Sequence, residues 1–206
     1  MARRTKADAA ATRNSLLDAA ERVFYEKGVS RASLTDIASA AGATRGAIYW
    51  HFKDKAELFN AMMDRVTHPL RQAINHSTSL ADTAPLERLR SLMQGVLSTI
   101  EHDEHTRRVF EIALYRVEYV EDLRVVRNRH SQECAAFAAL IARELSLAAA
   151  DQDIQLPMPA HIAAMGVQEM FDGMLQSLLL QHASFNLVVT TCDGIDTYLR
   201  GLGFRL

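Results

Sequence analysis

The 206-residue sequence contains few residues that break or cross-link a chain: nine glycines, four prolines and two cysteines. Because 49% of the residues are hydrophobic and glycine and proline are scarce, a disordered or collagen-like chain is excluded. Cys134 and Cys192 lie far apart and form no C-x-x-C motif, a usage typical of proteins in a reducing cytosol. We therefore expect a cytoplasmic globular protein that is long enough to build a core.

Long apolar runs are also lacking. A membrane-spanning helix needs roughly 18 or more apolar residues, and the longest candidate, 162–180, is interrupted by Glu169 and Asp172. The N-terminal residues are basic, but no apolar segment follows them, so they do not form a signal peptide. We expect no membrane partner.

Motifs of catalysis are lacking as well. The sequence has no G-x-S-x-G motif and no P-loop, and no strand-turn-helix context that would hold one. An enzyme with a His/Glu or Cys/His site is the rival class. The sequence favours a protein that is not an enzyme and uses no cofactor.

Alternating valine-rich segments typical of strands are nearly absent, whereas alanine and leucine dominate and apolar residues recur at helical spacing. The predicted fold class is therefore all-α, with about nine helices. Pro69 predicts a kink or a break near residues 67–68. The helices are expected over residues 7–27, 34–41, 45–51, 54–74, 85–102, 106–117, 120–149, 159–182 and 185–199.

Residues 33–55 have the pattern of two short helices joined by a tight turn. Ser33 and Asp36 form a variant of the capping box that starts the first helix. Gly42 supplies the left-handed residue that ends it, and Thr44 is the N-cap of the second.

The second short helix, 45–51, is rich in polar and aromatic residues and has only Ile48 and Phe52 as clear core anchors. A packed helix, a small-residue turn and such a helix form the layout of a helix-turn-helix DNA reader. The charge agrees: residues 1–66 carry eleven Lys and Arg against eight Asp and Glu, and the remaining residues carry twelve against seventeen. A basic head on an acidic body fits contact with phosphates, although so small an excess also arises by chance.

Residues 28–59 resemble the DNA-binding head of the TetR family of bacterial repressors, above all in Ile-Tyr-Trp-His-Phe (48–52) followed by Lys-x-Lys-x-x-Leu (53–58). The resemblance is closest to the AcrR- and TtgR-like branch, which represses multidrug efflux pumps, because Arg-Arg-x-x-Glu-Ile (107–112) also occurs there. It implies a helix-turn-helix DNA-binding domain at 7–66 and a helical ligand-binding and dimerisation domain at 67–206.

The resemblance also implies a homodimer whose two recognition helices enter successive major grooves of a palindromic operator. A ligand in the body would move the linking helix and separate the heads. The expected function is a ligand-responsive repressor of a multidrug efflux operon, released by apolar or aromatic compounds. The alternative is a repressor or activator with this fold that controls another pathway, such as stress or catabolic genes.

Arg45 is the residue expected to read a base. It lies at the start of the second short helix, where a guanidinium group can bond O6 and N7 of guanine. Gly46 and Ala47 carry little side chain, so the backbone can approach the groove and the Ala47 methyl can meet a thymine methyl.

Other side chains are expected to contact the DNA backbone. Tyr49 and His51 are placed for phosphate or sugar contacts, mostly through the resemblance. Trp50 either reaches the backbone or packs in the head, and Lys55 is an expected phosphate partner. The full set of expected DNA contacts is Ser33, Thr35, Thr44, Arg45, Gly46, Ala47, Tyr49, Trp50, His51 and Lys55.

The two C-terminal long helices carry more apolar surface than one body needs. Two adjacent apolar helices can pair with their copies as a four-helix interface. We expect a homodimer through these helices; the alternative is that both belong to an ordinary core.

An efflux-pump repressor needs a pocket for varied apolar compounds, and methionine suits adaptable surfaces, although a methionine stripe is more often plain core. In the resembling proteins polar pocket groups occur at the places held here by Phe110 and Leu114, which implies a more apolar pocket and a different ligand set. The candidate ligand-binding residues are Leu92, Met93, Val96, Phe110, Glu111, Leu114, Phe137, Met165, Met170, Phe171, Asp172 and Met174.

Two clusters could hold a metal. His102 and His105, among acidic residues, have a spacing that can hold Zn²⁺, but an acidic helix corner is the commoner meaning. His130 and Cys134 lie four residues apart on one helical face, where a cysteine is usually inert. We expect no metal at either.

Overall fold

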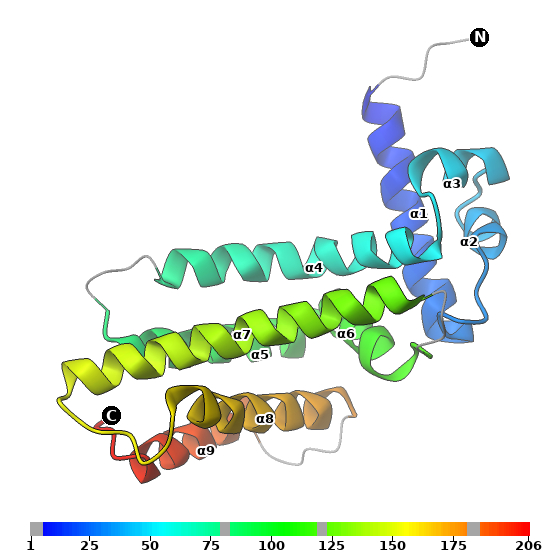
Figure 1. Ribbon diagram of the computed structural model, residues 1–206. Coiled ribbons are helices and arrows are strands. Elements are labelled where there is room, and N and C mark those ends of the chain that lie inside the picture. Colours follow the sequence, from blue (N-terminus) through cyan, green and yellow to red (C-terminus); the bar gives the residue numbers. More distant parts are fainter. Residues whose placement is uncertain (1–5, 79–82, 119–122, 181–185) are drawn as a thin grey trace. The chain divides into compact units, whose positions relative to one another are not determined.

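The computed structural model describes residues 6–78, 83–118, 123–180 and 186–206, and within these ranges it contains nine α-helices and no strand (Figure 1). The all-α prediction is therefore confirmed. The helices are α1 (Lys6–Lys27), α2 (Leu34–Ala40), α3 (Arg45–His51), α4 (Lys55–Thr78), α5 (Pro85–His102), α6 (Glu104–Tyr115), α7 (Arg124–Asp151), α8 (Ala160–Leu179) and α9 (Leu187–Gly201).

Helix α4 differs from its prediction. It continues through Pro69 to Thr78 as one helix, so, of the predicted kink or break near residues 67–68, the break is wrong, as is the expected end of the helix at residue 74. An interior proline removes one intrahelical hydrogen bond and crowds the preceding turn, but the amphipathic pattern on both sides keeps the segment helical. The predicted start of α7 at 120, the end of α8 at 182 and the start of α9 at 185 lie outside the described residues.

The chain packs into two compact units. Unit 1 comprises the residues up to Pro69 together with His105–Arg129, and unit 2 comprises Leu70–Glu104 together with His130–Leu206. Helices α4 and α7 each contribute to both. The division into domains at residues 66 and 67 stays a prediction, and packing adds that nearly all of α6 belongs with the head.

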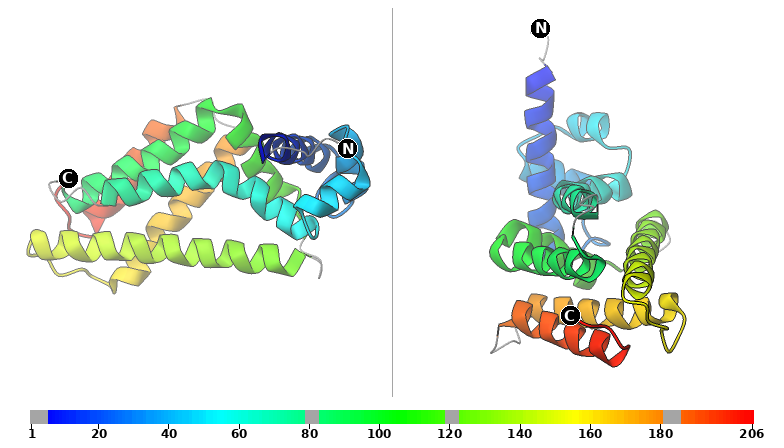
Figure 2. Two further views of the ribbon diagram at one scale, coloured as in Figure 1. Left: turned by 90° about the horizontal axis from the view of Figure 1, so that it is seen from above. Right: turned by 90° about the vertical axis from the view of Figure 1, so that its left-hand side faces the viewer.

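Helix α1 packs against α2 and α3 in unit 1 (Figure 2). Its buried face carries Leu16, Leu17 and Phe24, and the Phe24 and Phe59 rings lie 6.1 Å apart between centroids. Gly28, at φ 79°, ends α1 in the left-handed conformation that glycine adopts without strain. The next residue, Val29, donates its backbone N–H to the Arg116 carbonyl oxygen at 2.9 Å, which joins the end of α6 to the head.

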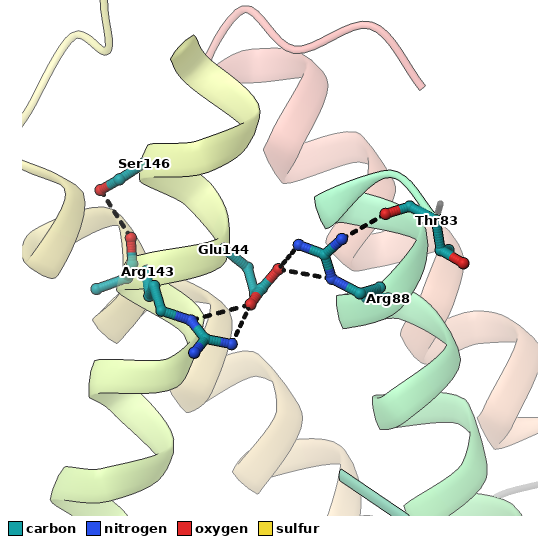
Figure 3. A network of polar contacts seen from close by, with 6 residues as sticks. Thr83, Arg88, Arg143, Glu144 and Ser146 are labelled. Atoms are coloured by element: carbon teal, nitrogen blue, oxygen red, sulfur yellow. Dashed lines mark hydrogen bonds and ion pairs between the residues drawn. The ribbon is translucent and has the colours of Figure 1, made fainter. Parts of the chain in front are cut away.

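Unit 2 contains a fully buried carboxylate, Glu144 of α7 (Figure 3). Its Oε2 accepts hydrogen bonds from Nη2 and Nε of Arg88 at 2.6 and 3.1 Å. Its Oε1 accepts two more from Arg143, with Nη2 at 2.6 Å. Arg88 also donates to the Thr83 carbonyl oxygen, so this ion pair fixes the start of α5 against α7.

No helix in the described parts of the chain is both long and apolar enough to cross a bilayer.

We predict that Glu144→Gln lowers the free energy of unfolding by about 3 kcal/mol, because the nearly buried Arg88 loses its counter-charge. The matched control is Glu133→Gln, whose pair with Arg71 is more than a third exposed on both sides and contributes less than about 1 kcal/mol. Urea unfolding followed by circular dichroism measures both. Equal losses in the two variants would contradict the assignment of Glu144 as the buried anchor.

Candidate nucleic-acid interface

The start of α2 is fixed by a capping box, as predicted. The Asp36 backbone N–H donates to Ser33 Oγ at 3.1 Å, and the Ser33 N–H donates to Asp36 Oδ2 at 3.0 Å. Lys27 Nζ lies 3.0 Å from Asp36 Oδ1. The hydrogen bond from the Ser33 side chain, followed by the contact with Lys27, lowers the pKa of Asp36 to about 2.

The turn between α2 and α3 is built from small residues. Gly42 has φ 64°, the left-handed conformation that the sequence predicted for it. The Ala43 N–H then donates to the Ala38 carbonyl oxygen at 2.8 Å, which closes the end of α2. The side chain of Thr44 accepts the Ala47 N–H at 3.2 Å and caps α3, also as predicted.

Helix α3 is held to unit 1 by very little of its surface. Ile48 is its one buried residue, and Phe52, the C-cap, is buried beside it. Both were the predicted core anchors. The Arg13 guanidinium lies 5.2 Å from the Phe52 ring centroid and adds a cation–π contact from α1. Four other residues of α3 are exposed: Arg45, Gly46, Tyr49 and Trp50.

Arg45, Tyr49 and Trp50, three of the predicted DNA contacts, are exposed on α3. Trp50 is 73% exposed and Tyr49 is 48% exposed. The alternative that Trp50 packs in the head is therefore wrong. Arg45 is exposed at the first turn, with its guanidinium carbon 5.7 Å from the Tyr49 ring centroid. His51 is half-buried and meets Trp50 edge to face at 4.5 Å between ring centroids.

Lys55 has a structural role that the motif does not reveal. Its Nζ donates to the carbonyl oxygens of Ser30 and Ala32 at 2.8 and 3.1 Å. The ammonium group thus joins the first turn of α4 to the link before α2. A phosphate that bound this ammonium group would share it with the two carbonyl oxygens. Ser33 and Thr35 are exposed at the start of α2. The phosphate contacts of all three residues stay predictions.

The residues expected to line the effector pocket are divided between the two units. Phe110, Glu111 and Leu114 of α6 are half-buried in unit 1, where Phe110 packs against the core. The other nine candidates belong to unit 2. There the Phe137 and Phe171 rings lie 5.6 Å apart between centroids.

Two candidates in unit 2 differ from plain apolar core. Met165 is 54% exposed, so unit 2 does not enclose its side chain. Asp172 is half-buried, and burial, followed by repulsion from Glu169, raises its pKa. Membership of the pocket stays a prediction for all twelve residues.

Unit 2 has a cleft that the sequence did not indicate. Its volume is about 450 Å³, and its lining combines the start of α5 with the ends of α7 and α9. The charged lining residues Arg90 and Asp196 pair with each other at 3.1 Å. None of the twelve candidates lines it.

The two possible metal clusters do not assemble. Within the described residues no three His, Cys, Asp or Glu side chains converge on a point that could hold a metal ion. His102 Nδ1 lies 2.8 Å from the Ser98 carbonyl oxygen, whereas His105 contacts the carboxylate of Glu21. Burial, followed by repulsion from Asp172, raises the pKa of the Cys134 thiol, which disfavours a reactive or metal-binding thiolate.

The sequence prediction missed a buried charge cluster around Glu21 of α1. A signal for it existed, because Glu21 stands at helical spacing from Leu17 and Phe24 and therefore on the buried face of α1. Its partners, His105, Arg108 and Arg65, come from α6 and α4, which lie far away in the sequence.

Comparisons with known proteins match the two parts of the chain separately. Residues 16–62 match the family described as bacterial regulatory proteins, tetR family. Residues 84–204 match the C-terminal region of MAATS-type transcriptional repressors.

Proteins that are similar over nearly the whole chain include transcriptional regulators as well. The HTH-type transcriptional regulator TtgR of Pseudomonas putida is 37% identical over 201 residues, which are 97% of this chain and 95% of TtgR. NalD, the secondary repressor of the MexAB-OprM multidrug efflux pump in Pseudomonas aeruginosa, has a TM-score of 0.84 at 33% identity, with 96% of this chain and 98% of NalD covered. A SmeT–triclosan complex has a TM-score of 0.79 at 31% identity, with 93% and 91% covered.

We predict that Asp36 titrates near pH 2 and that Ser33→Ala moves its pKa toward the ordinary value of 3.8. Because the folded-state pKa is lowered, the stabilisation from Asp36 is complete above its ordinary pKa and is lost as the pH falls toward 2. NMR titration of the carboxyl carbon measures both values. Ser39→Ala, at the other end of α2, is the control and should leave the titration unchanged. An unchanged pKa in Ser33→Ala would refute the capping box as the cause.

Proposed function

The chain belongs to the TetR family of bacterial regulatory proteins, and from that premise we propose that it is a ligand-responsive repressor that binds a palindromic operator as a homodimer. Its family and relatives are transcriptional regulators rather than enzymes, and it is a DNA-binding regulator similar to repressors of multidrug efflux pumps. The observation that carries the proposal is helix α3, which is capped, anchored by one buried side chain and exposed along its polar and aromatic residues.

The proposed reading mode follows from that exposure. Arg45, in the first turn of α3, bonds a guanine edge in the major groove, while Tyr49, Trp50 and His51 contact phosphate and sugar. Two copies of α3 enter successive major grooves, so the half-sites are about 34–36 Å apart, centre to centre. The chain works in the cytoplasm, where the operator is.

Helices α8 and α9 supply the proposed dimer interface. They lie beside each other in unit 2 (Figure 2), and each exposes large apolar side chains. On α8 these are Ile162 and Met165, and on α9 Val189 is 52% exposed. Pairing with the same two helices of a second copy would bury this surface, as in a four-helix bundle.

The proposed effector is an apolar or amphipathic aromatic compound that a multidrug efflux pump exports. Relatives support this choice: NalD represses such a pump, and SmeT has been solved with triclosan. The ring contact between Phe137 and Phe171 suits an aromatic ligand. Asp172, whose raised pKa favours the protonated form more than in water, supplies one polar group for orientation.

Arg45→Ala tests the reading mode. We expect operator affinity to fall about 10- to 100-fold, because one bidentate guanine contact gives about 1–3 kcal/mol of discrimination. Affinity for random duplex DNA should fall much less. The operator is first located by a footprint upstream of the chain's own gene, and anisotropy titrations at one salt concentration then measure both affinities.

The matched control for this experiment is Arg127→Ala, which removes an exposed arginine of α7. It should change the two affinities equally and weakly. If Arg45→Ala also lowers both affinities equally, Arg45 does not read a base. A footprint with no palindromic symmetry would reject the proposed function itself.

Val189→Glu tests the dimer. A carboxylate at this exposed apolar position of α9 would be buried without a partner in the proposed interface, so we expect the variant to sediment as a monomer at concentrations where the wild type is a dimer. Val125→Glu, at an exposed valine of α7, is the control and should stay dimeric. Dimers in both variants would place the interface elsewhere.

A further inference from the structure

Glu21 is a buried carboxylate in the helix that carries the DNA-reading head. Its side chain is 8% exposed, and α1, on which it lies, packs directly against α2 and α3. A shift of α1 therefore moves the reading helix. Charged residues are rarely buried unless they are paired, so the partners of Glu21 are contacts that join α1 to its neighbouring helices.

Two helices contact the same oxygen atom of this carboxylate. His105 Nδ1 of α6 lies 2.5 Å from Glu21 Oε2, and Arg65 Nη2 of α4 lies 3.6 Å from it. The other oxygen, Oε1, is 3.6 Å from Arg108 Nη1 of α6. Hydrogen bonds from a charged nitrogen to a carboxylate are normally about 2.7–2.9 Å long. Glu21 is thus bonded to α6 and only approached by α4.

The guanidinium group of Arg65 is correspondingly short of acceptors. Its Nη1 bonds Asp18 Oδ1 at 2.6 Å. Its Nε and Nη2 are buried, and among the residues that the structure describes neither has a hydrogen-bond partner. Buried donors without acceptors are rare and costly. A movement of less than about 1 Å by Glu21 toward Arg65 would bring Nη2 to hydrogen-bond distance of Oε2.

We propose that Glu21 is a positioning residue that exchanges its Oε2 bond between His105 of α6 and Arg65 of α4, and that this exchange shifts α1 and the reading head. The two donors belong to different helices and share one oxygen, so in this proposal a Glu21 that moves toward Arg65 weakens its contact with His105. A bistable contact of this kind can transmit a small movement of α6 or α4. Its consequence for DNA binding rests on the proposed function; the exchange itself does not.

The first test measures the competition without DNA. Urea unfolding of Glu21→Gln, Arg65→Gln and the double variant gives the coupling between Glu21 and Arg65 in the folding equilibrium constant. The same cycle is repeated in the His105→Gln background. Competition predicts that the coupling factor rises about threefold or more when His105 is removed, because Oε2 becomes available to Arg65. An unchanged coupling factor overturns the proposal.

Arg71→Gln provides the matched background control. Arg71 also lies on α4, and its pair with Glu133 at 2.7 Å does not involve Glu21. The coupling between Glu21 and Arg65 should be the same in this background as in the wild type. A rise in both backgrounds would show a general loss of stability instead of competition, and it would also overturn the proposal.

The second test leaves Glu21 in place, so it decides the matter even if Glu21→Gln fails to fold. In the proposal, His105→Gln favours the bond between Glu21 and Arg65 of α4, whereas Arg65→Gln favours the bond between Glu21 and His105 of α6. We expect operator affinity to change in opposite directions in the two variants, each by about 3- to 10-fold. Changes in the same direction, or none beyond that of Arg71→Gln, would overturn the proposal. If the wild type binds no operator, the proposed function fails while the unfolding cycles still test the exchange.

Discussion

The reading surface depends on one constraint: α3 is held by a single buried residue of its own, Ile48, with Phe52 directly after it. A seven-residue helix is too short to be stable alone, so its cap at Thr44 and this small anchor must suffice. Because the anchor is small, Arg45, Tyr49 and Trp50 of α3 stay exposed. Because α3 packs against both α1 and α2, the position of α3 depends on where these two helices lie.

Local signals predicted much of this arrangement. The capping box at Ser33, the left-handed Gly42 and the cap at Thr44 are formed by residues within four positions of each other, so spacing and residue type were sufficient. The contacts of Lys55 and Glu21 were missed because they join residues more than twenty positions apart. No residue pattern states which carbonyl oxygen or which guanidinium group tertiary folding will bring to them.

Glu144 and Glu21, two of the buried carboxylates among the described residues, are satisfied to different degrees. Glu144 in unit 2 accepts four hydrogen bonds from Arg88 and Arg143. Glu21 in unit 1 has one short contact, to His105, and two long ones, one of which leaves Arg65 with unmet donors. A fully satisfied pair holds one arrangement, whereas an incompletely satisfied pair can pass to another. This contrast is the basis of the exchange that we propose at Glu21.

The central claim is that an apolar aromatic compound bound by the body releases the operator. The most direct measurement follows the fluorescence anisotropy of a labelled operator duplex during titration with a panel of efflux substrates that includes triclosan, while calorimetry measures the binding of each compound to the DNA-free protein. The account predicts that compounds which bind the protein return the anisotropy to the value of the free duplex. An operator complex that stays intact at near-millimolar concentrations of compounds that do bind would contradict it.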